Sequence, residues 1–408
     1  MSKVQSITPD FYWLGALDPQ LRVFDIIMET QYGTTYNAYL LKGEEGIALF
    51  ETVKERFFDA YLENLKSLTP LEDITYIVVN HTEPDHVGSV AKLLDYAPQA
   101  TVVGSALAIK YLTQITNKTF KCKVVKEGDT LSLGNRTLRF LSVPLLHWPD
   151  TMYTYIEEEQ ILVTCDSFGE HYCDERLFKS QLEPEKVADF NEAYRYYFDM
   201  IMGPFKPYVQ KALIKIKDLP LSYICPGHGM ILEKENMEEY LALYDEWSRP
   251  QEVTVPTVII PYVSAYGYTA ELANTIAEGL KEADEQLEVK LYDLVESSIG
   301  EVATAIHNAQ GLLVGSPTLL ADALPPIWQL LGFLNPIMDR KLVAGCFGAY
   351  GWSGEALPHM QERLKQLKCE VPFEPFGIVF RASEEDKKKA KLFAKDFVAK
   401  LKEQKNNK

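Results

Sequence analysis

The pattern of apolar residues changes near residue 250, and this change limits the chain to two different kinds of domain. Before it, short runs of strand length alternate with polar turns and with a few helix-like stretches, such as KERFFDAYLENLKSL at 54–68. This mixture predicts a sandwich of sheets with helices packed outside. After it, strand-like and helix-like segments alternate regularly, which is typical of a doubly wound parallel α/β domain.

The expected strands can be placed from the apolar runs. In the first part they lie at 35–43, 45–53, 74–80, 100–105, 121–143, 150–166 and 221–228. In the second part they lie at 257–263, 287–295, 311–317, 341–350 and 376–380. The polar, proline-bearing stretch EWSRPQEVTVP contains the linker, at about 246–255. We therefore predict one domain at 1–250 and a second at 254–402.

Composition excludes several classes of partner. The formal net charge of −17 over 408 residues disfavours nucleic acid and anionic membranes, because both need a basic surface. No apolar run approaches the roughly 18 residues of a membrane span, and the start MSKVQSITPDFYW lacks the apolar core of a signal peptide. The six cysteines include no CxxC pair, so we expect free thiols in a reducing compartment. Together these features predict a cytoplasmic protein.

Residues 80–86, NHTEPDH, place two histidines and two carboxylates directly after the apolar run ITYIVV. In extended backbone, alternate side chains point the same way. We therefore expect His81, Glu83 and Asp85 to face one cavity, with His86 reaching around its edge. A loop at the end of a strand could hold two metal ions in this way.

Three later strand ends each add one potential ligand: His147 in VPLLHWPD, Asp166 in ILVTCDSFG and His228 in YICPGHG. Four histidines and three carboxylates suffice for two ions if Asp166 bridges them. Each ion would then also receive two histidines and one terminal carboxylate. The alternative is a set of unrelated polar loop residues, which the ordered spacing disfavours.

The set formed by HTEPDH, His147, Asp166 and the PGH of 226–228 resembles the metallo-β-lactamase fold, an αββα sandwich, over residues 1 to about 250. The resemblance implies a contrast with the hydrolytic members, which typically show HxHxDH and hold zinc. Here Glu83 stands where the second histidine would be. A carboxylate hardens the ligand set and adds negative charge, which favours iron that must be stable as ferrous and ferric ion. The interpretation is a redox site.

A possible phosphate site opens the second domain. In PYVSAYGYTAEL, hydroxyl groups and backbone N–H groups lie at the start of a predicted helix, which is where a phosphate belongs in such a sheet. The loops GSPTLLADALPP and GAYGWSGEA follow the third and fourth strands, and Tyr350 and Trp352 could stack on a planar ring. These loops resemble those of flavodoxin and imply FMN. A domain without cofactor and a CheY-like receiver are the alternatives, but a receiver needs an acidic pocket and the first loop has no carboxylate.

The cofactor-binding prediction covers all three loops. Its residues are Ser264, Ala265, Tyr266, Gly267, Tyr268, Thr269, Ser316, Pro317, Thr318, Leu319, Ala349, Tyr350, Gly351, Trp352, Ser353 and Gly354.

The order of the two domains resembles the flavodiiron proteins, also called A-type flavoproteins, over essentially the whole chain. The resemblance implies two non-haem iron ions, FMN, and reduction of dioxygen to water or of nitric oxide to nitrous oxide. Two ferrous ions and one reduced flavin store the four electrons that one dioxygen needs. The implied ligands are His81, Glu83 and His147 for one iron, and Asp85, His86 and His228 for the other, with Asp166 bridging. In some members the histidine that matches His86 does not coordinate.

The same resemblance implies proton donors near the substrate. His171 and either Tyr196 or Tyr197 occupy the matching positions, where protonated groups can hydrogen-bond a substrate oxygen and supply protons. Core packing of one of the two tyrosines is the alternative. Many members read FHG where this chain reads FDI, so Asp25 replaces a histidine that approaches the metal pocket. Asp25 could shift proton delivery toward His171 and the tyrosines, or it could cap a turn and point to solvent.

Partners also follow from the resemblance. It implies a head-to-tail homodimer, alone or within a tetramer, in which the FMN of one subunit meets the irons of the other. Without CxxC pairs, any rubredoxin-like donor must be a separate protein. Two other functions compete: a di-zinc hydrolase with a regulatory flavodoxin-like domain, and a non-enzymatic electron carrier or redox sensor. Glu83 argues against the first, and the seven ordered ligands argue against the second.

Overall fold

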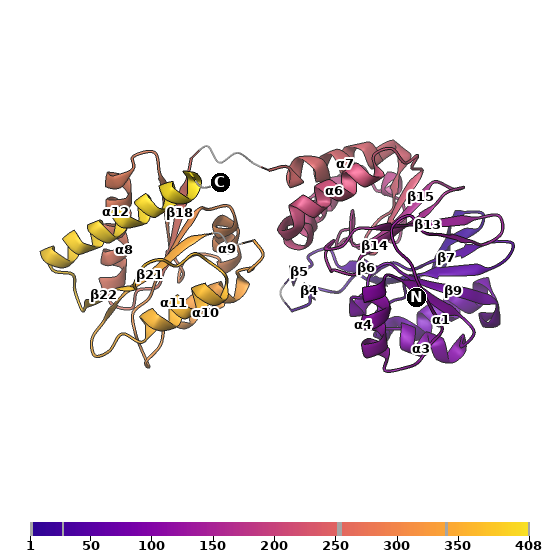
Figure 1. Ribbon diagram of the computed structural model, residues 1–408, viewed down its shortest axis with the longest axis horizontal. Coiled ribbons are helices and arrows are strands. Elements are labelled where there is room, and N and C mark those ends of the chain that lie inside the picture. The colour runs from indigo at the N-terminus through magenta and orange to yellow at the C-terminus, as the bar shows by residue number, and fades with distance from the viewer. Residues whose placement is uncertain (1–2, 27, 251–254, 339–341, 407–408) are drawn as a thin grey trace. The chain divides into compact units, whose positions relative to one another are not determined.

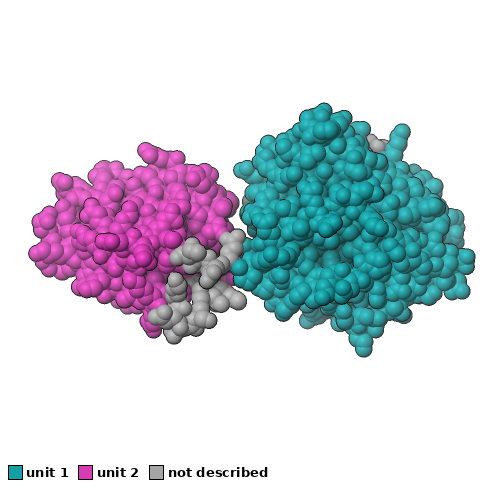
Figure 2. Space-filling model, turned by 90° about the horizontal axis from the view of Figure 1, so that it is seen from above, with its two compact units in different colours: residues 1–250 teal, residues 251–408 magenta. Residues whose placement is uncertain are grey.

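The structure, a computed structural model, describes residues 3–26, 28–250, 255–338 and 342–406. The chain forms two compact units, residues 1–250 and 251–408, which Figures 1 and 2 distinguish. The expected linker at 246–255 begins within a helix, α7 (Lys234–Ser248), and its residues 251–254 lie outside the described ones.

The first unit contains two large sheets (Figure 1). The seven-stranded sheet has the order β1 (Gln5–Thr8), β2 (Phe11–Trp13), β7 (Tyr39–Lys42), β8 (Ile47–Phe50), β9 (Ile74–Val79), β10 (Thr101–Gly104), β11 (Cys122–Val124). The six-stranded sheet has the order β12 (Thr130–Ser132), β13 (Thr137–Ser142), β14 (Met152–Ile156), β15 (Ile161–Cys165), β16 (Tyr223–Pro226), β17 (Leu232–Glu233). Two small pairs join β3 (Ala16–Asp18) to β6 (Thr34–Tyr36) and β4 (Val23–Phe24) to β5 (Met28–Glu29).

Helices cover the outer faces of these sheets. The α-helices are α1 (Phe58–Leu68), α2 (Pro84–Val87), α3 (Val90–Tyr96), α4 (Ala106–Thr116), α5 (Val187–Tyr197), α6 (Lys206–Ile216) and α7. Shorter turns are η1 (Glu55–Phe57), η2 (Leu71–Asp73), η3 (Lys179–Gln181), η4 (Pro184–Lys186), the π-helix η5 (Phe198–Met202), and η6 (Gly203–Phe205).

The core of this unit follows the two-residue period of its strands. Phe50 and Val78 of the first sheet pack with Phe140 of the second, between the two sheets. Leu49 and Ile77, one position earlier in each strand, belong to the cluster that also contains residues of the outer helices. Both faces of the sheets are therefore buried. The predicted αββα sandwich is confirmed.

The second unit is a parallel five-stranded sheet in the order β19 (Glu288–Asp293), β18 (Thr257–Tyr262), β20 (Gly311–Gly315), β21 (Val343–Tyr350), β22 (Phe376–Val379). Its helices are α8 (Tyr268–Ala283), α9 (Ile299–His307), α10 (Pro325–Phe333), α11 (Ala356–Gln366) and α12 (Glu384–Asn406). The first strand of the unit lies between the second and the third, which is the flavodoxin-like order with its switch point beside β18. In the part of the chain that the structure describes, no helix is long and apolar enough to cross a membrane.

Helices lie on both faces of this sheet (Figure 1). Ile259 of β18 packs with residues of α9, α10 and α11. Its neighbours Val258 and Ile260 pack with residues of α8 and α12 on the other face. The doubly wound prediction is confirmed, and the loops that follow the central strands β18, β20 and β21 meet at one edge of the sheet.

Candidate metal centre and cofactor-binding loops

The strand ends of the first unit bring the predicted ligands together. His81 follows β9, Asp166 follows β15 and His228 follows β16, and all three side chains are buried. The extended backbone expected for the whole HTEPDH stretch is wrong for its second half, because Asp85 and His86 lie in the short helix α2. Pro84 occupies the start of that helix, where its fixed φ angle suits a helical turn.

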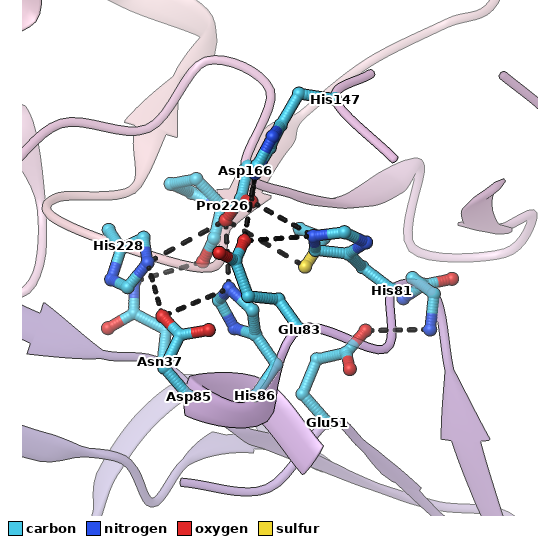
Figure 3. A network of polar contacts seen from close by, with 12 residues as sticks. Asn37, Glu51, His81, Glu83, Asp85, His86, His147, Asp166, Pro226 and His228 are labelled. Atoms are coloured by element: carbon cyan, nitrogen blue, oxygen red, sulfur yellow. Dashed lines mark hydrogen bonds and ion pairs between the residues drawn. The ribbon is translucent and has the colours of Figure 1, made fainter. Parts of the chain in front are cut away.

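One group of four side chains consists of Glu83 and the three side chains around its carboxylate, His81, His147 and Asp166 (Figure 3). Glu83 Oε2 lies 3.2 Å from His81 Nε2 and 2.8 Å from His147 Nε2. Asp166 Oδ2 closes the group, at 3.4 Å from His81 Nε2 and 3.2 Å from His147 Nε2. The ligand atoms of the group all lie within 4.8 Å of one another, as a shared metal ion requires.

A second group forms around Asp85 (Figure 3). Asp85 Oδ2 lies 3.0 Å from His228 Nε2 and 3.5 Å from His86 Nε2. The other oxygen of Asp166, Oδ1, lies 2.9 Å from His86 Nε2 and 3.7 Å from His228 Nε2. Asp166 therefore presents one oxygen to each group, which is the geometry of a bridging carboxylate.

The electrostatics of the pocket favour added positive charge. Burial alone would lower the pKa of His86, but the carboxylates of Asp85 and Asp166 raise it to about 10. Burial alone would raise the pKa of Asp166, but the histidines, His86 first, hold it well below its usual value. Both oxygens of Asp85 and Nε2 of His86 are buried without a hydrogen bond among the described residues. Such a donor set fits two metal ions.

Several buried residues that the sequence patterns did not identify hold the ligand loops. Asp150 Oδ2 accepts hydrogen bonds from the backbone N–H and the hydroxyl of Thr82, at 2.9 and 2.8 Å, and its Oδ1 lies 3.8 Å from His81 Nδ1. Thr52 donates both its N–H, at 2.8 Å, and its hydroxyl, at 2.6 Å, to the carbonyl oxygen of His86. These contacts fix the ligands on either side of Glu83.

The His228 loop is held by Asn37, which is fully buried. Asn37 Nδ2 donates to the carbonyl oxygens of Pro226, at 2.9 Å, and Gly229, at 3.0 Å. Its Oδ1 accepts from Trp13 Nε1 at 2.8 Å. The amide thus fastens the backbone on both sides of His228, and Figure 3 shows the contact on the Pro226 side.

His171 and Tyr197 lie beside the second metal group, and Tyr196 does not share their contacts. The ring centroid of His171 is 4.9 Å from those of Tyr197 and His228. Tyr196 is 37% exposed. Burial, together with His228, lowers the pKa of His171 well below its ordinary value.

Asp25 lies in the turn of the β4–β5 hairpin, where its φ angle is +47°. The residue as a whole is exposed, but its carboxyl is partly shielded and lies near the carboxylates of the pocket. Burial first, and then the charges of Glu83 and Asp85, raise the pKa of Asp25 to about 6. The charges of Glu83 and Asp85 therefore act on the carboxyl of Asp25.

The first cofactor loop prepares the start of α8 for an anion. Gly267 precedes the helix with φ +84°, and a Cβ there would meet nothing within 4 Å. Ser264 Oγ accepts from the backbone N–H of Ala270 at 3.2 Å, and Thr269 is buried at the helix start. Tyr266 is exposed, as are Ala265 and, in part, Tyr268. Free N–H groups at the start of such a helix suit a phosphate.

One side-chain hydrogen bond braces the second loop, and another joins the second loop to the third. Ser316 Oγ accepts from the N–H of Leu324 at 3.1 Å, and Thr318 Oγ1 accepts from the N–H of Ala356 at 3.3 Å. Trp352 is fully exposed. The other predicted residues of these loops lie at the ends of β20 and β21: Pro317, Leu319, Ala349, Tyr350, Gly351, Ser353 and Gly354. The three loops together fit a flat ring with a phosphate tail.

Comparisons with known proteins agree with both sites. Residues 34–229 match the ODP family beta lactamase, and residues 260–393 match flavodoxin. These two parts define the class: a metallo-β-lactamase-like metal domain joined to a flavodoxin-like domain. The chain belongs to the flavodiiron protein family. Membership implies FMN and a non-haem di-iron site, and makes the chain an oxidoreductase.

Relatives match nearly the whole chain. It is 42% identical to the flavo-diiron protein FprA2 of Clostridium acetobutylicum over 96% of this chain and 98% of that protein. It is 36% identical to the nitric oxide reductase of Moorella thermoacetica over 92% of this chain and 93% of that protein. The solved rubredoxin oxygen:oxidoreductase of Desulfovibrio gigas is 29% identical, with a TM-score of 0.75 over 98% of this chain and 99% of that one.

Proposed function

We propose that this protein reduces dioxygen to water, nitric oxide to nitrous oxide, or both, at a di-iron site. The observation that carries the proposal is Asp166, whose two oxygens face two adjacent ligand groups. Bound iron would supply electrons to the substrate there. Relatives named nitric oxide reductase and rubredoxin oxygen:oxidoreductase support both substrates.

We assign the seven residues of the two groups as the ligands, with Asp166 shared. His81, Glu83 and His147 would hold one ion, and Asp85, His86 and His228 the other. His86 is included because its Nε2 points at both Asp85 and Asp166. His171 and Tyr197 border the pocket and would hydrogen-bond the substrate.

FMN would bind at the three loops of the second unit and pass electrons to the metals. A separate rubredoxin-like protein or reductase would supply them, because the chain has no CxxC pair. We further propose a head-to-tail homodimer, alone or within a tetramer. Exposed apolar side chains support it: Val23 and Ile26 in the β4–β5 hairpin, and Leu320 and Trp352 on the cofactor loops.

The test is anaerobic reduction of the purified protein, followed by separate additions of dioxygen and of nitric oxide, with turnover measured for each. Elemental analysis accompanies it. Two iron ions and one flavin per chain, with turnover of at least one gas, are expected. Zinc without flavin, together with hydrolysis of thioesters or phosphoesters, would instead establish the hydrolase.

A further inference from the structure

A buried thiol lies against the second metal group, outside the seven assigned ligands. Cys165 is the last residue of β15, directly before Asp166, and is fully buried. Its Sγ lies 4.0 Å from Asp166 Oδ1, the carboxylate oxygen that faces the second group. One ligand atom each from Cys165, Asp166 and His86 lie within 4.8 Å of one another, so a single metal ion could contact all three.

The backbone around Cys165 is held in place. Its φ angle is +49°, in the left-handed region that residues other than glycine rarely adopt. Its carbonyl oxygen accepts from the N–H of Gly227 at 2.6 Å, which ties Cys165 to the loop that carries His228. A Cβ at Gly227 would lie 2.7 Å from Cε1 of His86 and 3.2 Å from the carbonyl carbon of Cys165. Cys165 and His86 therefore pack against the same glycine.

The imidazole of His86 indicates an ion independently of the cysteine. His86 is fully buried, and neither of its ring nitrogens makes a hydrogen bond within the described residues. Its Nε2 points at Asp166 Oδ1, at 2.9 Å. A buried ring nitrogen without a hydrogen bond is costly, and a bound ion removes that cost.

The two ligand groups define two ion positions, and these differ in the donors within reach. The described members of the first group are two imidazoles and two carboxylates, with no sulfur among them. The second group also offers imidazoles and carboxylates, but it has the thiol of Cys165 beside it. Thiolate is a soft donor that favours ions of the zinc class, whereas carboxylates favour harder ions. The second position is therefore the softer of the two.

We propose that Cys165 makes the second position a binding site for thiophilic divalent ions such as zinc, with its thiolate, His86 and Asp166 as ligands. The thiol loses its proton to solvent when the ion binds, because a metal-bound cysteine is a thiolate. Asp85 and His228 lie beside the same position and offer further donors. The proposal concerns which ions the pocket accepts, and it does not depend on the identity of the substrate.

The first test detects the sulfur ligand directly. Full-length protein with bound FMN is freed of iron with a chelator and reloaded with ¹¹³Cd²⁺, which substitutes for zinc and whose NMR shift rises strongly when sulfur coordinates. We expect one cadmium signal of the parent to have the shift of a thiolate-bound ion. Cys165→Ala should lose that shift. Cys225→Ala, which removes a buried thiol of the neighbouring strand β16, should keep it.

Two outcomes of this test overturn the proposal. One is a parent whose cadmium signals all have shifts typical of oxygen and nitrogen ligands. The other is a sulfur-type shift that survives in Cys165→Ala. If that variant fails to fold, the spectrum of the parent alone decides whether sulfur coordinates.

The second test measures selectivity between ions. Competition with a chromophoric chelator gives the zinc affinity, and elemental analysis after anaerobic reloading with ferrous ion gives the iron content. Cys165→Ala should weaken binding of one zinc ion about tenfold or more and keep the iron content of the parent. Equal loss of zinc and iron overturns the selective role of the thiol. Neither test measures turnover of a gas, so their failure and the failure of the proposed function are separate.

Discussion

Asp166 and His86 are in direct contact, with Oδ1 of the carboxylate 2.9 Å from Nε2 of the imidazole. The other carboxylate oxygen faces away from His86, toward His147 at 3.2 Å. One side chain therefore serves both ligand groups, whereas His228 serves only the second. This difference predicts unequal effects of their removal.

Asp166→Ala should release both metal ions, because each loses a ligand and the shared charge that holds the pair together. His228→Ala should chiefly weaken the binding of one ion, the one in the second ligand group. Iron per chain, measured after desalting, distinguishes the two outcomes. Loss of a single ion in both variants would contradict the bridging role.

Asn37→Ala should weaken the binding of the metal ion near His228 by about 10–100-fold, because the loop that carries this ligand loses its support. The carbonyl groups of Pro226 and Gly229 would also lose partners, at a cost of about 1–3 kcal/mol each in stability. Metal titration of the apoprotein and urea unfolding measure the two effects. Asn308→Ala, at an exposed helix end, is the control and should change neither.

Asp150→Asn is the matched variant on the other side of the pocket, since Asp150 supports Thr82 and His81. The variant should weaken binding of the ion held by His81, Glu83 and His147, and should leave binding of the other ion unchanged. Mössbauer spectra of ⁵⁷Fe-loaded protein separate the two positions. If Asn37→Ala and Asp150→Asn deplete the same position, the two supports do not act on separate ions.

Gly267→Ala combined with Thr269→Ala should weaken FMN binding. The alanine would have to adopt φ +84°, which a residue with a Cβ rarely does, and the second change removes a hydroxyl at the start of α8. Flavin fluorescence on dilution measures the dissociation constant. Gly332→Ala in α10, where a Cβ also meets nothing within 4 Å, is the control. Full flavin retention in the double variant would place the phosphate elsewhere.

Asp25→His should change the pH dependence of turnover, or the ratio of dioxygen to nitric oxide activity, with iron and FMN contents intact. A histidine in this turn places a titratable donor near Glu83 and Asp85, where the chain now has an acceptor. Asp25→Asn is the control that removes charge without adding a titrating group. If the pH profile and the gas ratio of Asp25→His both equal the parent's, Asp25 takes no part in the reaction.

Asp174→Asn should destabilise the first unit by about 1 kcal/mol near neutral pH, a value reduced for partial solvent screening. Asp174 accepts from Arg176 Nε at 2.7 Å and Lys186 Nζ at 3.1 Å. Burial alone would raise its pKa, but Arg176 holds it well below the usual value. The stabilisation is therefore present above the unfolded-state pKa of about 3.9 and is lost as pH falls below it. Urea unfolding of parent and variant should differ at pH 7 and converge in acid.

The sequence allowed the ligand types and both folds to be predicted, because ligands at strand ends and a two-residue apolar period leave local patterns. It did not indicate Asn37 or Asp150, since their roles depend on loops that meet only in the folded unit. The helix α2 was also missed, because four residues are too few to show a helical period. The β4–β5 hairpin was missed because each of its strands has only two residues, too few to show the alternation of a strand.

The ligands come from strand ends of both sheets of the sandwich, spread over residues 81 to 228. During synthesis, a chain that has so far exposed only the first sheet carries the HTEPDH ligands but neither Asp166 nor His228. The complete set of iron ligands would therefore form only after the second sheet has left the ribosome and packed against the first. Late completion of the site keeps an unfinished chain from holding both metal ions.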